Sequence, residues 1–268
     1  MGEAAFRWLI RAGRVLAALV LLAMLAPFAY AVWMSFAPGV LLEPPTDRWS
    51  LRWYREFLGS AKWTAALQTT AEVAALSVVG SLVGGLGVAV AVTRYHFRGR
   101  SALSGAVLLP MFVPAVVLGM GLLPLVRGVG LQGMAVAIAA AHSLASLPVV
   151  FLLLRSALSQ VDPELERAAR GLGAGPVTAF RRVTLPLVSP AIAAGAVIAC
   201  ILSVNEFTLA LFLGTPRTLP AALWPESRYQ ETPLIAAASC LSVLVTLLGM
   251  GLAARLWRIS LSRPIPSA

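Results

Sequence analysis

Two carboxylic acids stand inside long apolar stretches of this chain, where an ionised side chain is costly. Glu206 closes the run Ser203-Val204-Asn205-Glu206, and Glu72 lies in an earlier apolar stretch. A carboxylate in hydrocarbon costs about 2.5–3.5 kcal/mol on insertion scales, so it usually faces a protein interior or a water-filled path. Glu206, with Ser203 and Asn205 beside it, is therefore a candidate for contact with a cationic solute. The alternative is a structural role, as the partner of an arginine or of a helix backbone in a neighbouring subunit.

Glu72 and His142 are expected to have structural roles. Glu72 lies nearer the end of its apolar stretch, where a charge costs less, and pairing with another polar group there explains its presence. No cysteine, aspartate or second histidine surrounds His142 at the spacing of metal ligands. His142 is therefore interpreted as an interior histidine with satisfied hydrogen bonds, and the sequence predicts no metal site.

The sequence offers little for catalysis. It contains no Gly-x-Ser-x-Gly motif and no paired acids within the apolar stretches that would form an acid–base couple. Its one lysine, Lys62, does not belong to a glycine-rich loop ending in Gly-Lys-Ser or Gly-Lys-Thr, so the chain cannot hold ATP in a P-loop. We expect no catalytic residue and no cofactor in this chain. If ATP drives its function, ATP and magnesium bind to a separate ATPase chain. A proton-coupled secondary transporter, with Glu72 and Glu206 as relays, is the alternative of another class.

The elements that must position these residues are long apolar helices. Of the 268 residues, 59% are apolar and only 12% are charged, which is typical of polytopic membrane proteins rather than soluble domains. Crossing a bilayer takes about 20 apolar residues, and six runs are long enough. The sequence therefore predicts an all-α membrane protein with six transmembrane helices. The runs are Trp8–Phe36, Ala65–Thr93, Leu103–Leu125, Leu131–Leu154, Pro190–Leu213 and Pro233–Leu256.

The distribution of basic residues predicts the orientation of these spans. Cytoplasmic segments of membrane proteins carry an excess of arginine and lysine. If both termini are cytoplasmic, 14 of the 21 basic residues fall on the inner side, five of them in the segment 155–189. The outer side then holds seven, which are Arg48, Arg52, Arg55, Lys62, Arg127, Arg217 and Arg228. We therefore expect a multi-pass protein whose two termini and 155–189 loop are cytoplasmic.

Three features of the apolar runs and their connections carry further expectations. Gly80 and Gly84 form a small-xxx-small face, which lets another helix approach closely. Pro110 and Pro114 remove backbone donors from the third run and should bend or loosen it. In the outer segment Ala37–Lys62, the stretch WSLRWYREFL, with Ser50 as a possible cap, predicts an amphipathic helix at the membrane surface.

The charged loop between the fourth and fifth runs has its own local chemistry. Asp162 is placed to cap a helix that begins at Pro163. Gly171 and Gly173 can end that helix, because glycine accepts a left-handed conformation without steric cost. The positions of a proline and a serine predict two further helix starts. Pro176 would start a second short helix, and Ser189 would cap the next long helix, with Pro190 in its first turn.

The loop resembles the cytoplasmic EAA loop of permease subunits in binding-protein-dependent ABC importers. That pattern is Glu-Ala-Ala, three residues, Gly, nine residues, Ile, one residue and Leu-Pro. This chain has Arg167-Ala168-Ala169, Gly173, Val183 and Leu185-Pro186 at the same spacing. It departs from the pattern at Arg167, where glutamate is expected, although Glu166 stands one position earlier. The resemblance implies that this loop is the coupling helix, which docks into a groove of the ATPase.

The resemblance extends over most of the chain and narrows to the permease subunits of spermidine/putrescine importers. It is carried by the segment SLRWYREFL, the turn at 94–100, the LLPMFVPAVVLGMG run, Ala141-His142 and the SVNEFTLALFL run. It implies a type I ABC importer permease fold, with one permease domain over 1–268 and a core over about 64–256. It also implies import of a polyamine such as spermidine or putrescine across the bacterial cytoplasmic membrane. Importers of other solutes, such as an aminophosphonate, ferric ion, an opine or a sugar, share these features and remain alternatives.

The resemblance also implies partners and site residues. The partners are a second permease subunit, a dimer of ATPase subunits, an extracytoplasmic solute-binding protein and membrane lipid, without nucleic acid. The ATPase-coupling residues would be Glu166, Arg167, Ala168, Ala169, Gly173, Leu185 and Pro186. Residues on the solute path would be Ser203, Asn205 and Glu206.

Overall fold

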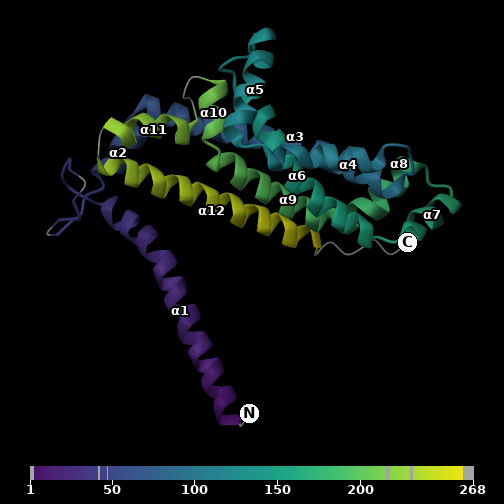
Figure 1. Cartoon of the computed structure of the whole chain (residues 1–268), viewed down its shortest axis with the longest axis horizontal. Coiled ribbons are helices and arrows are strands. Elements are labelled where there is room, and N and C mark those ends of the chain that lie inside the picture. The colour runs from purple at the N-terminus through teal and green to yellow at the C-terminus, as the bar shows by residue number, and fades with distance from the viewer. Residues whose placement is uncertain (1–2, 42, 47, 215–217, 230–231, 262–268) are drawn as a thin grey trace. The chain divides into compact units, whose positions relative to one another are not determined.

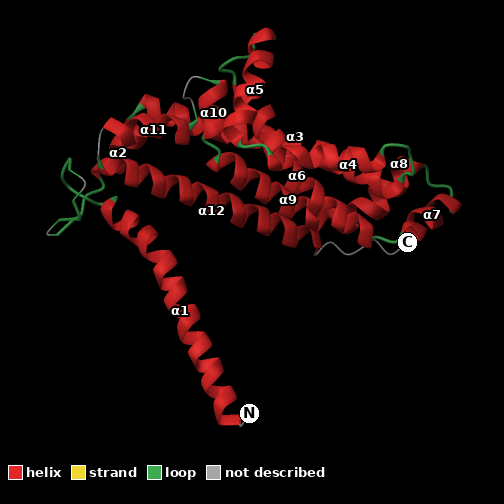
Figure 2. Ribbon diagram, viewed as in Figure 1, coloured by secondary structure: helices red, strands yellow, loops and turns green. Residues whose placement is uncertain are grey.

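The computed structural model describes residues 3–41, 43–46, 48–214, 218–229 and 232–261. Every element in these ranges is a helix, as the sequence predicts (Figure 2). The chain falls into two compact units, one of Met1–Ala61 with Pro225–Val243 and one of Lys62–Trp224 with Leu244–Ala268. Arg217 and Arg263, both used to predict the orientation of the spans, lie outside the described residues.

The first unit contains a long apolar helix and a short amphipathic one. Helix α1 (Glu3–Met34) is apolar and long enough to cross a membrane from Ile10 to Met34. Helix α2 (Arg52–Gly59) buries Trp53 and Phe57, and the indole nitrogen of Trp53 donates a hydrogen bond of 3.0 Å to the carbonyl oxygen of Ala37. The expected amphipathic helix is therefore present, but its first cap position is Leu51 and not Ser50.

Three long helices form the core of the second unit (Figure 1). They are α3 (Ala61–Arg94), α6 (Ala135–Gln160) and α9 (Leu185–Asn205). Apolar side chains from all three meet in one cluster of fully or nearly fully buried residues. The cluster includes Ala89, Val92, Val150, Phe151, Leu154, Leu158, Val188 and Ala199.

Small residues bring α3 against α6, as the spacing of its glycines predicts. A Cβ atom at Gly80 would lie 2.5 Å from the Oγ atom of Ser143, and one at Gly85 would lie 2.9 Å from the Cγ1 atom of Val150. The hydroxyl of Ser143 also donates to the carbonyl oxygen of Ser77 over 3.2 Å. The glycine face therefore allows contacts between the two helices that any larger side chain would block.

The third apolar run is not one straight helix. It forms α4 (Arg100–Leu108), the 3-10 turn η1 (Leu109–Phe112) and α5 (Ala115–Gly128), and the direction changes by 108° between the two parts. Pro110 and Pro114 lie on either side of the bend, and neither has an N–H to donate to the preceding turn. The predicted effect of these prolines is confirmed.

The fifth run is also interrupted, which the sequence did not predict. Helix α9 ends at Asn205, and a short helix α10 (Thr208–Leu213) begins after Glu206 and Phe207. Helix α10 packs on α5, where the side chain of Phe212 lies against Gly119. Glu206 therefore lies at a break between helices and not within one continuous helix.

Two further helices follow, α11 (Leu219–Tyr229) and α12 (Pro233–Leu261). Among the described residues, four helices are long and apolar enough to cross a membrane, and the bent pair of α4–η1 and α5 makes a fifth. Helix α12 extends over 29 residues, and its stretch Pro233–Leu248, in which the side chains are described, is apolar. The all-α membrane fold is confirmed, while the count of six spans stays a prediction.

Candidate functional site

The loop at 155–189 folds as its local chemistry predicts. Helix α7 (Pro163–Gly171) begins with a proline, and the Oδ1 atom of Asp162 accepts a hydrogen bond of 2.9 Å from the backbone N–H of Glu164. The helix ends at Gly171, and Gly173 has a φ of +92°, in the left-handed region that favours glycine. The cap and the glycine hinge are both confirmed.

The second half of the loop differs from the expectation. Helix α8 (Pro176–Ala179) passes directly into the π-helical turn η2 (Phe180–Thr184) and then into α9, so the chain is helical from Pro176 to Asn205. Ser189 does not cap a helix, because its hydroxyl donates over 2.8 Å to the carbonyl oxygen of Pro186 within α9. Pro186 lacks an N–H for the carbonyl of the preceding turn, and the wider turn lies directly before it.

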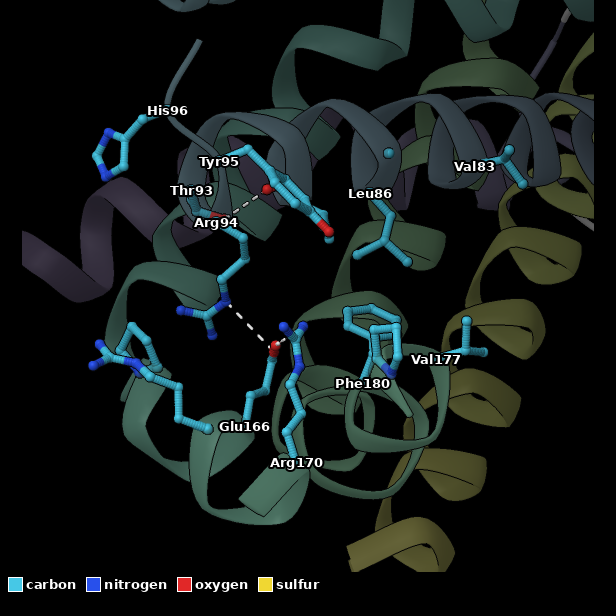
Figure 3. Close-up of a pocket in the computed structure, with 15 residues that line it drawn as sticks. Val83, Leu86, Thr93, Arg94, Tyr95, His96, Glu166, Arg170, Val177 and Phe180 are labelled. Carbon is cyan, nitrogen blue, oxygen red and sulfur yellow. Dashed lines mark hydrogen bonds and ion pairs between the residues drawn. The ribbon is translucent and has the colours of Figure 1, made fainter. Parts of the chain in front are cut away.

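Glu166 is the centre of a buried polar cluster at the inner face of α7. Only 9% of the residue is exposed. Its Oε1 atom accepts a hydrogen bond from the Thr184 hydroxyl and lies 3.6 Å from the Nε atom of Arg94. Its Oε2 atom lies 3.8 Å from an amino nitrogen of Arg170. Figure 3 shows the side chains of Arg94 and Arg170 converging on this carboxylate from two helices.

Arg94, which the sequence analysis placed only on the cytoplasmic side, also binds the end of α6. Both of its terminal nitrogens donate to the carbonyl oxygen of Val161 over 3.1 Å. Val161 is the C-cap residue of α6, and α7 begins two residues later at Pro163. Sequence reasoning missed Arg94, Val161 and Thr184 because they are far apart along the chain and none belongs to the motif.

An open groove of about 980 Å³ lies beside this cluster (Figure 3). One side is apolar and the other carries arginines of α7. Its lining includes Val83, Leu86 and Val90 of α3, Val177 of α8, Phe180 of η2, and Arg167 and Arg170 of α7. The groove therefore joins the apolar surface of α3 to the charged surface of α7.

The outer surface of α7 carries a different set of residues. Arg167 forms an ion pair of 2.6 Å with Glu164, and both side chains are more than 60% exposed. Ala168 is exposed as well, while Ala169 is half-buried. Leu172, directly after the helix, is 91% exposed, which is a large apolar surface for a side chain at the end of a helix. Of the predicted coupling residues, Gly173 and Pro186 are exposed and Leu185 is half-buried, whereas Glu166 faces inward.

The three residues expected on a solute path do not converge on one point. Ser203 is buried, and its hydroxyl shares a hydrogen bond of 2.9 Å with the Nδ1 atom of His142. Asn205 is exposed and donates to the carbonyl oxygen of Ile201 over 2.8 Å. The half-exposed Glu206 accepts a hydrogen bond of 2.9 Å from the backbone N–H of Leu209, which caps α10. Each therefore has a structural partner in this chain.

His142 and Glu72 have different environments. His142 is buried with Nδ1 bonded, as an interior histidine should be, but its Nε2 atom has no partner among the described residues. Glu72 is exposed on α3, beside the buried Val73. Within the ranges that the structure covers, no three residues of the types His, Cys, Asp and Glu gather as metal ligands would.

Comparison with known proteins identifies the family. Residues 81–258 match the family described as the inner membrane component of binding-protein-dependent transport systems. The chain belongs to this family. It is therefore a multi-pass permease subunit of an ABC importer in the inner membrane, and the resemblance inferred from the EAA-like loop is confirmed.

Several curated relatives of this permease have described transport functions. The putrescine transport system permease protein PotI of Escherichia coli is 30% identical over 81% of this chain and 80% of its own length. The spermidine/putrescine permease protein PotC of Haemophilus influenzae is 29% identical over 74% of this chain and 78% of its own. A protein of Haloferax volcanii, described as a probable molybdenum ABC transporter permease, is 36% identical over 64% of this chain. That match spans 66% of its length, slightly less than two thirds.

Solved structures support the fold of this permease. A bacterial alginate ABC transporter in complex with a periplasmic protein matches it with a TM-score of 0.78 and 16% identity over 98% of both chains. An inward-facing structure of the MetNI methionine transporter matches with a TM-score of 0.61 and 22% identity over 75% of this chain and 99% of that one. These neighbours establish the type I importer permease fold.

Proposed function

We propose that this permease imports a small cationic solute, a polyamine such as putrescine or spermidine. The observation that carries the proposal is the charge of the spans. Glu72 lies on the α3 span and Glu206 directly follows the α9 span, whereas the lysine and arginines of the described spans lie toward the ends of their helices. Carboxylates at membrane depth attract an ammonium group and repel an oxyanion. The similarity to PotI and PotC supports the same solute class.

Import of a molybdenum oxyanion is the second candidate, because the Haloferax relative has the higher identity. An oxyanion passing through this chain would meet these two carboxylates, while the basic residues of the described spans lie toward the helix ends. Such a path would need helix N-termini or arginines from the partner subunit to offset the repulsion. The carboxylates of Glu72 and Glu206 therefore favour a polyamine over an oxyanion.

We further propose that α7 couples this permease to a separate ATPase. Its exposed surface, which includes Arg167, Ala168 and Leu172, would contact a groove of the ATPase, with Asp162–Ala174 as the contact segment. The apolar surface of Leu172 suits a pocket on a partner, since large exposed apolar side chains often mark interfaces. The remaining partners would be a second permease subunit, a second ATPase subunit and an extracytoplasmic binding protein. ATP and magnesium would bind on the ATPase, and both ends of this chain would be cytoplasmic.

Reconstitution tests the solute and the coupling together. The permease, its genomic-neighbour ATPase and binding protein would be assembled in liposomes with ATP inside, and uptake of putrescine, spermidine and molybdate would be measured separately. We expect ATP-dependent uptake of a polyamine and none of molybdate. Uptake of molybdate alone would refute the cationic solute while leaving the ATPase coupling intact. A permease that purifies without any ATPase and transports without ATP would refute the coupling proposal.

A further inference from the structure

We propose that Glu166 is a positioning residue that joins the coupling helix α7 to the end of α3 through Arg94, so that α3 moves together with α7. The inference rests on the proposed coupling function, because it concerns how motion of α7 reaches the spans. It differs from the role that the motif resemblance implies for Glu166, since the side chain faces this chain's own helices and not the surface of α7.

The geometry shows a carboxylate enclosed by its own chain. The side chains of Arg94 and Glu166 are only 10% and 11% exposed. The Glu166 carboxylate meets Arg94 from α3, Thr184 from η2 and Arg170 one turn further along α7. A carboxylate so enclosed stays charged only when cations and donors surround it. Its removal therefore leaves Arg94 without its buried counter-charge.

Arg94 makes the cluster more than an ordinary ion pair. It is the last residue of α3, and its guanidinium group donates two hydrogen bonds to the carbonyl oxygen of Val161 while its Nε atom forms an ion pair of 3.6 Å, without a hydrogen bond, with the carboxylate of Glu166. A planar guanidinium can donate two parallel hydrogen bonds to one carbonyl while its charge also faces a carboxylate, whereas a lysine presents one point charge. Arg94 therefore connects the end of α3 to the connection between α6 and α7.

This connection matters because α3 has no covalent route to the coupling helix nearby. Helix α7 follows α6 directly at Val161, and it reaches α9 through α8 and η2. Those two spans would follow any movement of α7 through the backbone. Helix α3 ends 67 residues before Val161 along the chain, so its cytoplasmic end follows only through contacts such as those of Arg94. The Glu166 cluster adds α3 to the helices that the ATPase would move.

The position of Thr184 also supports a role for Glu166 in joining α7 to the spans. The residue is fully buried at the end of the π-helical turn, where its hydroxyl donates to Glu166. A π-turn changes the direction of the side chains that follow it and is often found at functional sites. The carboxylate thus contacts the start of the α9 span as well as the end of α3.

The first test measures the link in the full-length permease alone, in lipid nanodiscs. Cys200 and Cys240 would be replaced by serine, and spin labels placed at His96→Cys, after α3, and at Leu172→Cys, after α7. Pulsed electron paramagnetic resonance then reports the distribution of distances between the two labels. We expect a single narrow distribution with Glu166 present, and a clearly broader one in Glu166→Gln and in Arg94→Gln.

Matched variants separate the link from general loss of charge. Arg98→Gln makes the same chemical change at an exposed arginine four residues beyond Arg94, and it should keep the narrow distribution. Arg94→Lys keeps the charge but lacks the planar set of guanidinium donors, so its distance distribution should also be broad. If Glu166→Gln does not insert into the membrane, Thr184→Val is the substitute, because it removes only the hydroxyl that donates to Glu166 and should broaden the distance distribution to a smaller extent. A distribution as narrow as that of the wild type, in Glu166→Gln or in its substitute Thr184→Val, would overturn the proposal.

The second test asks whether the link transmits motion. In complexes that still contain the ATPase, putrescine transported per ATP hydrolysed should fall about tenfold in Glu166→Gln, within the range for residues that modulate coupling. Arg98→Gln should keep the wild-type ratio. An unchanged ratio in Glu166→Gln would refute the transmission role. If the wild-type complex takes up no putrescine, the proposed solute fails, and the distance distributions still decide whether the link exists.

Discussion

The Nδ1 atom of His142 on α6 lies 2.9 Å from the Oγ atom of Ser203 on α9, and both side chains are buried. Both side chains are enclosed by protein, on helices long and apolar enough to cross a membrane. Hydrogen bonds between membrane helices contribute about 0.6 kcal/mol on average and up to about 1.7 kcal/mol. Ser203 lies two residues before the end of α9, so the pair fixes α6 against α9 close to the break at Glu206.

Ser203→Ala should destabilise the permease by about 1–3 kcal/mol, because it leaves the His142 ring nitrogen buried without a partner. Replacing both residues in His142→Phe/Ser203→Ala should cost less than the two single changes added together, since neither polar group then remains. The free energy of unfolding of the two single variants and the double variant is measured by SDS titration of the purified proteins in mixed micelles. Additive losses would show that the two side chains do not interact in the folded protein.

Gly85→Ala should destabilise the packing of α3 on α6 by about 1–3 kcal/mol, the usual cost of overfilling a packed site. A Cβ atom there would lie 2.9 Å from the Cγ1 atom of Val150 and 3.3 Å from the backbone nitrogen of Phe151, and the backbone cannot yield as a flexible side chain would. Gly87→Ala is the matched control, because nothing lies within 4 Å of its Cβ position. It should be neutral or slightly stabilising. The same SDS titration compares the two, and equal stabilities would contradict the close approach.

Local features of this fold were predictable because local chemistry decides them. Asp162 and Pro163 favour the start of a helix and Gly173 favours its end through local chemistry alone, so the sequence predicted the position of α7 correctly. The glycine spacing in α3 likewise predicts a close helix contact without naming the partner helix. Such features depend on residues a few positions apart.

Features that depend on distant residues were not predictable. Glu166 and Arg94 are 72 positions apart, and no periodicity connects them, so the buried cluster appears only in three dimensions. The break at Glu206 was missed for another reason. Its apolar flanks continue the pattern of one helix, while the Glu206 side chain caps a new helix by binding the N–H of Leu209. Ser189 was placed at a cap because the proline after it matched a helix start, although α9 in fact begins at Leu185, with Pro186 in its first turn.

Gly173→Leu should abolish transport while the protein still inserts. The φ of +92° is costly for any residue with a Cβ atom, about 1–2 kcal/mol, so the hinge after α7 would shift. Gly173→Ala should act in the same direction, because the strain comes from the Cβ atom and nothing lies within 4 Å to clash. Gly175→Ala is the control, since Gly175 has a φ of −64° that alanine adopts freely. ATP-dependent uptake in liposomes distinguishes them, and wild-type transport by Gly173→Leu would contradict the coupling assignment.

Arg167→Glu should weaken association with the ATPase and leave the fold intact. The substitution places two acids three residues apart in α7, but the pair that it removes is more than 60% exposed, and exposed pairs contribute only about 0.2–1 kcal/mol. Any large loss of ATPase on co-purification would therefore reflect a contact made by Arg167 itself. Unchanged stoichiometry and activity in the mutant complex would show that the ATPase groove offers no acid or carbonyl to this arginine.

Glu206→Gln separates the two roles open to this residue. Glutamine keeps an oxygen that can accept the hydrogen bond from Leu209 and loses only the charge, whereas Glu206→Ala loses both. If the carboxylate meets a cationic solute, Glu206→Gln should reduce putrescine uptake about 10- to 100-fold, as expected for a charged hydrogen bond of about 1.5–3 kcal/mol. The affinity of the binding protein for putrescine should not change. If Glu206 acts only as the cap of α10, Glu206→Gln should transport normally and Glu206→Ala should lose about 1 kcal/mol of stability. Uptake and SDS unfolding measured on one preparation of each variant decide between these outcomes, and normal uptake by an intact Glu206→Gln complex would remove the carboxylate from solute recognition.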